Sequence, residues 1–234
     1  MSPIIAANFK ANLTRLEVQT YTQTLDSILR DTTAQVSIFP SATALLHNNF
    51  RHFHIGVQNA YFAHNGGFTG EIGLSQLQEF GISSLLIGHS ERRQIFLESQ
   101  DFINKKFAFY KEAGFHIYYC IGESFDIRQK GEDALKVFLS NQLKDIDLTY
   151  PKLIVAYEPI WAIGTGVSAS MEEIESTHTM LKSFTDAPLL YGGSVNSTNA
   201  ADILSLKNVD GVLVGSASLD VHGFVKIINS CTKD

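Results

Sequence analysis

The chain has 234 residues, of which 44% are hydrophobic, so it is long enough to bury one sizeable core. It carries 24 acidic and 18 basic residues, a net charge of -6, and no stripe of Lys and Arg, which argues against nucleic acid as a partner. No apolar run approaches the roughly 18 residues of a membrane span, and the first residues lack the basic flank and long apolar stretch of an export signal.

These features predict a cytoplasmic protein without a membrane partner. The two cysteines, Cys120 and Cys231, suit a reducing compartment better than a disulfide scaffold. Neither has the clustered partners of a metal site, so no metal is expected.

Short apolar runs rich in β-branched residues alternate with longer segments of helical period along the chain. This alternation is typical of βα units and a parallel sheet. Eight such units predict a single (β/α)8 barrel, with an outer ring of helices, over residues 1–234. The expected strands are 4–7, 36–39, 55–58, 84–87, 116–121, 153–157, 189–191 and 211–214.

Two of the intervening segments show apolar residues near three- and four-residue steps, as core-facing helices do. The expected core-facing stripes are Leu13, Leu16, Thr20, Leu25, Ile28 and Leu29 in the first segment, and Phe102, Ile103, Phe107 and Tyr110 in the second.

Polar residues and glycines follow several predicted strands at their carboxyl ends. In a barrel these ends meet on one face, where active sites are built, so the residues are expected to converge. This placement indicates a catalyst. The residues are Asn8, Lys10, His89, Glu91, Glu158, Gly192, Gly193, Ser194, Gly215 and Ser216.

Lys10, together with Asn8, follows the first strand and is expected to place a positive charge near the reacting centre. A fixed ammonium lowers the energy of an anionic intermediate. Two alternatives remain open at this point. One is a Schiff-base lysine, which barrel aldolases place on a later strand, and the other is an exposed lysine at a helix start.

His89 follows the fourth strand and precedes a helix whose first turn holds Ser90 and Glu91. The positive end of that helix favours a neutral imidazole that donates a hydrogen bond to a carbonyl oxygen. A structural role is the usual one for a single histidine, and the chain has eight. The position directly after a strand distinguishes His89.

Glu158 follows the sixth strand and begins a mostly apolar segment. Pro159 and the glycines of 164–166 are expected to act as hinges of a lid, with Trp161 and Ile163 as its apolar body. Closure of the lid would dry the site and make Glu158 a general base for a proton next to a carbonyl. The alternative is a surface glutamate before a proline turn.

Glycine-containing loops follow the last two strands, at 192–194 and 215–216. Glycine lets backbone N–H groups approach an anion, and this fold binds phosphate at these two loops. The sequence therefore predicts a phosphorylated substrate. The alternative is that the glycines only make tight turns.

Seven motifs in order make the chain resemble the triosephosphate isomerase family over essentially its whole length. They are N-F-K at 8–10, G-F-T-G-E at 67–71, G-H-S-E-R-R at 88–93, C-I-G-E at 120–123, A-Y-E-P-I-W-A-I-G-T-G at 156–166, Y-G-G-S-V at 191–195 and D-G-V-L-V-G-S-A-S-L at 210–219.

The resemblance implies interconversion of dihydroxyacetone phosphate and D-glyceraldehyde 3-phosphate through an enediolate, without metal or organic cofactor. It implies Glu158 as the proton-shuttling base and His89 as the electrophile, with Glu91 beside Lys10. Residues implied to contact the substrate are Asn8, Lys10, Gly164, Ser194, Gly215 and Ser216, the last four through phosphate.

The resemblance also implies a homodimer in which the loop around residues 58–73 enters the neighbouring subunit and carries Thr69 toward its active site. A mobile surface loop in a monomer is the alternative, since this loop is rich in glycine.

The sequence departs from the family pattern in three places. Phe9 stands where Trp is common, Ser216 stands where a second glycine is common, and the region 45–54 is compressed. Two other functions remain as alternatives: a barrel enzyme for another sugar phosphate, whose lid and base motifs should differ, and a non-catalytic sensor of a phosphorylated metabolite.

Overall fold

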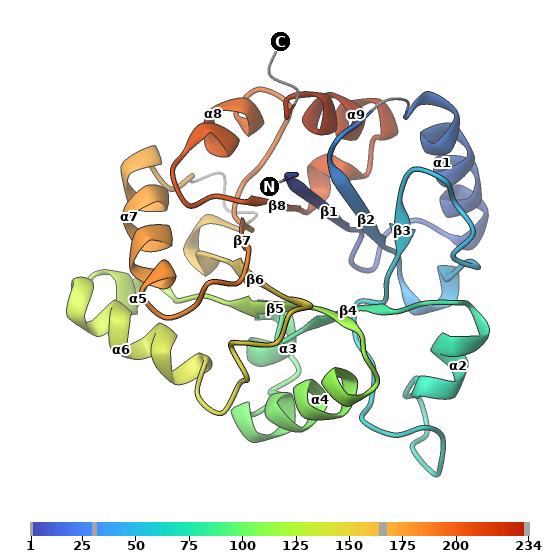
Figure 1. Cartoon of the computed structure of the whole chain (residues 1–234), viewed down its shortest axis with the longest axis horizontal. Coiled ribbons are helices and arrows are strands. Elements are labelled where there is room, and N and C mark those ends of the chain that lie inside the picture. Colours follow the sequence, from blue (N-terminus) through green and yellow to red (C-terminus); the bar gives the residue numbers. More distant parts are fainter. Residues whose placement is uncertain (1, 30–31, 164–167, 232–234) are drawn as a thin grey trace.

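Eight parallel strands form a nearly closed barrel with helices around it, as the computed structural model of the chain shows (Figure 1). The structure describes all residues except 1, 30–31, 164–167 and 232–234. The predicted (β/α)8 architecture is therefore confirmed. The strands are β1 (Ile4–Asn8), β2 (Gln35–Phe39), β3 (His54–Ile55), β4 (Ser84–Ile87), β5 (His116–Ile121), β6 (Leu153–Tyr157), β7 (Leu189–Tyr191) and β8 (Gly211–Val214).

The strands are hydrogen-bonded in the order β3-β2-β1-β8-β7-β6-β5-β4. A parallel bridge between Val57 and Leu85 links the two ends of this order. There the Val57 amide donates to the Ser84 carbonyl at 2.9 Å, and the Leu86 amide donates to the Val57 carbonyl at 3.0 Å. The barrel is thus closed by a short contact beyond the end of β3.

The third strand is shorter than the predicted 55–58. It ends at Ile55, and of the residues beyond it only Val57 makes a strand-like bridge. Gly56 lies against the ring of Phe39, where a Cβ atom would overlap the ring. The backbone therefore leaves the regular ladder at a close approach that glycine permits.

The helices lie outside the barrel (Figure 1). They are α1 (Arg15–Ile28), α2 (Leu74–Glu79), α3 (Ser90–Gln94), α4 (Gln100–Glu112), α5 (Phe125–Arg128), α6 (Glu132–Gln142), α7 (Met171–Lys182), α8 (Ala200–Ser205) and α9 (Val221–Asn229), with 3-10 turns η1 (Ala42–Ala44), η2 (Ile160–Ala162) and η3 (Ser216–Ser218). Between β2 and β3 the chain forms only η1, in the region that the sequence shows to be compressed.

The core-facing stripe predicted for the first helix is only partly correct. Leu25 is buried, but Leu16 is 72% exposed and Ile28 is 38% exposed. The helix instead buries Val18 and Tyr21, because the Tyr21 hydroxyl donates to the Ser218 carbonyl at 2.7 Å and fixes the helix rotation. Of the stripe predicted for α4, Ile103, Phe107 and Tyr110 are buried, whereas Phe102 is only partly buried.

Two buried layers follow from the alternation of strand side chains. One fills the barrel interior and includes Ala6, Cys120 and Ala156, while the larger one packs between the strands and the helices. Small side chains near the carboxyl ends of the strands leave room for a cavity there. Within the described residues, no helix is long and apolar enough to cross a membrane.

Candidate active site

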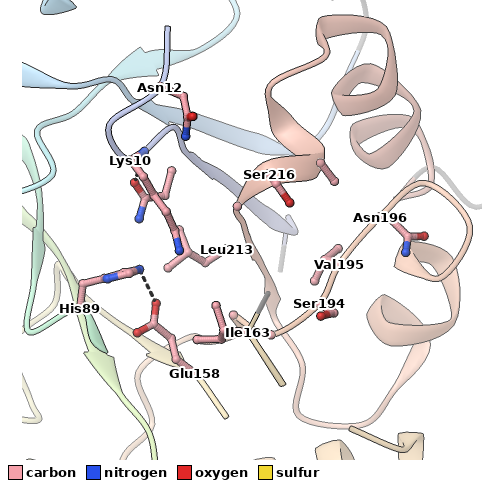
Figure 2. Close-up of a pocket in the computed structure, with 15 residues that line it drawn as sticks. Lys10, Asn12, His89, Glu158, Ile163, Ser194, Val195, Asn196, Leu213 and Ser216 are labelled. Carbon is pink, nitrogen blue, oxygen red and sulfur yellow. Dashed lines mark hydrogen bonds and ion pairs between the residues drawn. The ribbon is translucent and has the colours of Figure 1, made fainter. Parts of the chain in front are cut away.

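A cavity of about 420 Å³ opens at the carboxyl ends of the strands, and most of the predicted site residues line it (Figure 2). The predicted residues that it brings together are Asn8, Lys10, His89, Glu158, Ser194, Gly215 and Ser216. The predicted Gly192 and Gly193 and the lid residue Ile163 also line it. Residues for which the sequence had suggested no side-chain role complete the wall: Asn12, Val195, Asn196, Leu213 and Ala217.

Glu158 lies at the floor of this cavity and is only 2% exposed. Its amide donates to the Ile121 carbonyl at 2.7 Å, which fixes the backbone just beyond β6. Its Oε2 accepts a hydrogen bond from the Ser90 amide at 3.0 Å. Gly122 touches the Glu158 backbone so closely that a Cβ atom there would overlap it. The carboxylate is therefore held rigidly inside a dry part of the site.

His89 follows β4 and caps α3. Gly88, with φ 75°, adopts a left-handed conformation that suits glycine and turns the chain so that His89 faces the cavity. The imidazole Nδ1 accepts the Glu91 amide at 3.2 Å, so the ring proton resides on Nε2. Nε2 lies 3.1 Å from Glu158 Oε1 and donates to it (Figure 2). This geometry supports the neutral imidazole expected from the sequence.

Lys10 has a strained backbone, with φ 52°, in a region that non-glycine residues seldom occupy. The strain is held by two side chains. The Lys10 amide donates to Asn8 Oδ1 at 3.0 Å, and Gln58 Nε2 donates to the Lys10 carbonyl at 2.8 Å. The ammonium Nζ bonds Glu91 Oε1 at 2.6 Å, so the predicted supporting carboxylate does lie beside it. The positive charge is thereby aimed into the cavity mouth.

The opposite wall is formed by the loops after β7 and β8. In the part of the chain that the structure describes, the backbone amides of Ser194, Gly215 and Ser216 donate to no protein acceptor. The Ser194 hydroxyl donates to the Ala162 carbonyl at 2.7 Å, which joins this wall to the segment after Glu158. Free amides facing a cavity are suitable donors for an anion.

The segment after Glu158 is anchored by a residue to which the sequence analysis gave no role, Glu123. Its Oε1 accepts Trp161 Nε1 at 2.9 Å and the Tyr157 hydroxyl at 3.0 Å. Glu123 is fully buried, and this burial raises the pKa of its carboxyl. The sequence feature that could have identified Glu123 is its place at the end of the motif at 120–123, just after a strand. The predicted second hinge at 164–166, with the predicted phosphate contact Gly164, lies outside the described residues.

Thr69 and Glu91 differ from the other predicted residues. Thr69 lies on an exposed loop and does not line this cavity. Glu91 lines a neighbouring cavity of about 240 Å³, which shares Asn8, Lys10 and His89 with the first. The exposed side chain of Phe96 lies at that second cavity.

The described residues contain no group of three or more His, Cys, Asp or Glu side chains that could hold a metal ion. Cys120 lies in the barrel interior, where burial, followed by the charge of Glu158, raises the pKa of its thiol well above the usual value. The thiol therefore stays protonated beside the carboxylate. The arrangement of a buried carboxylate, a neutral imidazole, an ammonium and free amides suits proton transfer on a phosphorylated carbonyl compound.

Comparisons with known proteins agree with this chemistry. The family model described as Triosephosphate isomerase matches residues 3–231. The chain is 70% identical over 231 residues to the triosephosphate isomerase of Helicobacter hepaticus, covering 97% of this chain and 98% of that protein. It is 54% identical over 226 residues to that of Nitratiruptor sp., with 96% and 97% covered. It is 50% identical over 232 residues to that of Helicobacter pylori strain Shi470, with 98% and 99% covered.

Proposed function

The chain belongs to the triosephosphate isomerase family, whose enzymes interconvert dihydroxyacetone phosphate and D-glyceraldehyde 3-phosphate, and from this premise we propose which of its residues perform the reaction. The isomerisation is a step of glycolysis. We assign it to one catalytic domain, residues 1–234, working in the cytoplasm without metal or organic cofactor. The cavity at the carboxyl ends of the strands is the active site.

Glu158 is the base. It removes a proton from the carbon next to the carbonyl of the substrate and returns it to the neighbouring carbon, so the carboxylate is regenerated in each turnover. Its place at the cavity floor, 3.1 Å from His89 Nε2, supports this role, because a base must lie within reach of a substrate bound in the cavity.

His89 is the electrophile. Its Nε2–H donates to Glu158 while no substrate is bound, and the same N–H donates to the substrate oxygens during the reaction. The Glu91 amide holds Nδ1 as an acceptor, which keeps the ring neutral and the proton on the side of the cavity. A neutral donor stabilises an enediolate oxygen and exchanges protons with it.

Lys10 stabilises the negative charge that develops on the enediolate, and Asn8 fixes its backbone. Because Glu91 pairs with the ammonium, the lysine is kept extended at the cavity mouth. An ammonium in a site that excludes water contributes several kcal/mol in typical cases.

The phosphate is bound by the backbone of Ser194, Gly215 and Ser216, with Gly164 from the lid. The amides of the first three face the cavity without a protein acceptor, which supports this assignment. Closure of the segment after Glu158 over the phosphate keeps water away from the enediolate and prevents loss of phosphate.

The observation that carries the proposal is the hydrogen bond between His89 and Glu158 on the floor of the cavity. A coupled assay with D-glyceraldehyde 3-phosphate should show rapid turnover by the purified protein. Glu158→Gln should keep the fold and bind dihydroxyacetone phosphate but lose at least about 100-fold in kcat. Glu112→Gln, an exposed position at the end of α4, is the matched control. Near-normal turnover by Glu158→Gln would refute the base assignment.

We also propose a homodimer formed through the loop around residues 58–73, with Thr69 reaching the partner's site. Three consecutive apolar side chains, Ile95, Phe96 and Leu97, are exposed, and Phe96 lines the cavity beside Glu91 together with Gln58 and Asn59. They support the dimer, because such a patch usually marks an interface. Sedimentation equilibrium should give twice the chain mass, and Phe96→Asp should shift it toward the monomer. A monomeric parent protein would rule the dimer out.

A further inference from the structure

A third cavity, of about 340 Å³, lies at the opposite end of the barrel from the active site, where the strands begin. Residues from the starts of β2, β3, β4 and β5 and from the chain just before β3 line it. Ligand pockets in proteins typically have volumes of about 300–1,000 Å³, so this cavity is large enough for a small metabolite. We call it the amino-terminal pocket. The triose phosphate reaction makes no use of it.

The interior of this pocket carries more hydroxyl protons than the protein accepts. Ser37 Oγ and Tyr118 Oη lie 3.0 Å apart, and each residue is 4% exposed. One hydrogen bond joins these two hydroxyls, so one of their two protons has no acceptor among the described residues. Burial raises the pKa of Tyr118 to about 12, so its hydroxyl remains a proton donor at neutral pH.

Ser84, at the start of β4, adds a further hydroxyl. The residue is 7% exposed and lines the pocket, and its hydroxyl has no partner within the described part of the chain. A hydroxyl that faces a cavity without a protein partner is free to donate to a bound group. The pocket thus offers donors in excess of acceptors.

The mouth of the pocket is lined by groups that are positively charged or become so on protonation. His54 begins β3 beside Ser37, and His116 begins β5 beside Ser84. Arg51 and His52, just before β3, also line the pocket. None of these four side chains forms an ion pair with a described residue.

The charged groups around His116 determine how it titrates. Burial lowers its pKa, and the charges of Lys152 and His54 lower it further. Asp26 of α1 is an acidic group near this mouth, and its Oδ1 accepts the backbone amides of Arg51 and His52. Positive charges at the mouth therefore repel one another.

We propose that the amino-terminal pocket binds a small oxyanion, a phosphate or carboxylate group of a metabolite, between the hydroxyls of Ser37, Tyr118 and Ser84 and the imidazoles of His54 and His116. An anion supplies the missing acceptor for the hydroxyls and offsets the repulsion among the cations. Binding is coupled to proton uptake by His116, because a nearby anion stabilises its protonated ring. The affinity is therefore higher at pH 6 than at pH 8.

The test is a titration of the ¹⁵N-labelled full chain with inorganic phosphate and, separately, with succinate, at pH 6.0 and pH 8.0. The ring signals of His54 and His116 report on this pocket, His89 reports on the active site, and exposed His222 of α9 is the internal control. We expect saturable shifts at His54 and His116, about tenfold tighter at pH 6.0, and no matching shift at His222.

Two variants separate binding from a general effect of salt. Ser84→Ala removes a hydroxyl that has no protein partner, so the fold and the turnover should be unchanged while affinity at the pocket falls about fivefold or more. His116→Gln should remove most of the pH dependence. Saturation by phosphate alone identifies a phosphorylated ligand, saturation by succinate alone identifies a carboxylate, and saturation by both identifies an unselective oxyanion site.

The proposal is overturned if neither anion produces saturable shifts at His54 and His116, or if His222 shifts in parallel with them. It is also overturned if Ser84→Ala and His116→Gln, folded and active, bind as tightly as the parent. Because the reporters and both variants lie at the opposite end from the active site, failure here leaves the assignments of Glu158 and His89 untouched.

Discussion

The imidazole Nε2 of His89 lies 3.1 Å from Oε1 of Glu158, so the proposed electrophile and the proposed base are hydrogen-bonded to each other in the free enzyme. The imidazole can donate only one proton from Nε2, because Nδ1 is occupied as the acceptor of the Glu91 amide. A substrate carbonyl must therefore replace the Glu158 carboxylate as the acceptor of that N–H group. Substrate binding then frees one oxygen of Glu158 at the moment when the base is needed.

Replacement of His89 by glutamine tests this relationship. The His89→Gln side chain keeps a donor but cannot exchange a proton with the enediolate oxygens, so kcat should fall by about 100-fold or more. KM should change much less, because the phosphate contacts are untouched. Steady-state kinetics in both directions measure this, with His222→Gln as the exposed control. A kcat within a few-fold of the parent would show that proton exchange at His89 is dispensable.

The barrel was predictable from the sequence because strand and helix follow each other with little interruption. The strands β4, β5 and β6 begin and end at the predicted residues. Each is mostly apolar, as expected of a strand that is buried on both faces. The face of α1 was not predictable. Spacing alone fits Leu16 or Val18 as the buried position, and the distant hydrogen bond from Tyr21 to Ser218 decides between them.

Much of the site was predictable because a barrel brings the carboxyl ends of its strands together whatever their distance in sequence. The contact between Lys10 and Glu91 is an example, because the two residues lie 81 positions apart in the chain. Glu123 received no role because its partners, Trp161 and Tyr157, lie on the next strand and its loop. A buried carboxylate is recognised as an anchor only when the donors around it are known.

Glu123 should be detectable through the single tryptophan of the chain. Its buried carboxyl accepts the Trp161 indole N–H, and burial raises its pKa above 4.5. Protonation weakens the charge-assisted hydrogen bond to the indole. We therefore expect the fluorescence of Trp161 to titrate with a midpoint above 4.5 in the absence of substrate, and to lose this titration in Glu123→Gln.

The control for this titration is Glu173→Gln. Glu173 is also near Arg128, at 3.6 Å, but it does not bond the indole. Its substitution should leave the fluorescence midpoint in place. A titration that survives in Glu123→Gln would assign the signal to another group.

His178 should make the protein sensitive to mild acid. The ring is fully buried, its Nδ1 bonds the Asn208 carbonyl at 3.0 Å, and burial lowers its pKa to about 4. Since the unfolded chain binds this proton near pH 6.5, the contribution of His178 to stability is complete above that pH and falls as the pH drops toward 4. The expected loss at pH 5 relative to neutral pH is about 2 kcal/mol.

Urea unfolding at pH 7 and pH 5, at one protein concentration, measures this loss. In His178→Gln the difference between the two pH values should shrink by about 2 kcal/mol, whereas in His222→Gln it should stay as in the parent. An imidazole signal of His178 that titrates near pH 6.5 in the folded protein would contradict the prediction, whatever the stability of the variants.

Ser194 should affect both the position of the segment after Glu158 and the binding of the substrate phosphate. Its hydroxyl donates to the Ala162 carbonyl at 2.7 Å, whereas its amide faces the cavity without a protein acceptor. Ser194→Ala removes the first interaction and keeps the second. A neutral hydrogen bond is worth about 0.5–1.5 kcal/mol, so kcat/KM should fall between about twofold and tenfold. Ser197→Ala, an exposed serine in the turn before α8, is the control. If inhibition by inorganic phosphate is unchanged in Ser194→Ala while kcat/KM falls, the hydroxyl acts on the lid, because loss of a phosphate contact would weaken both.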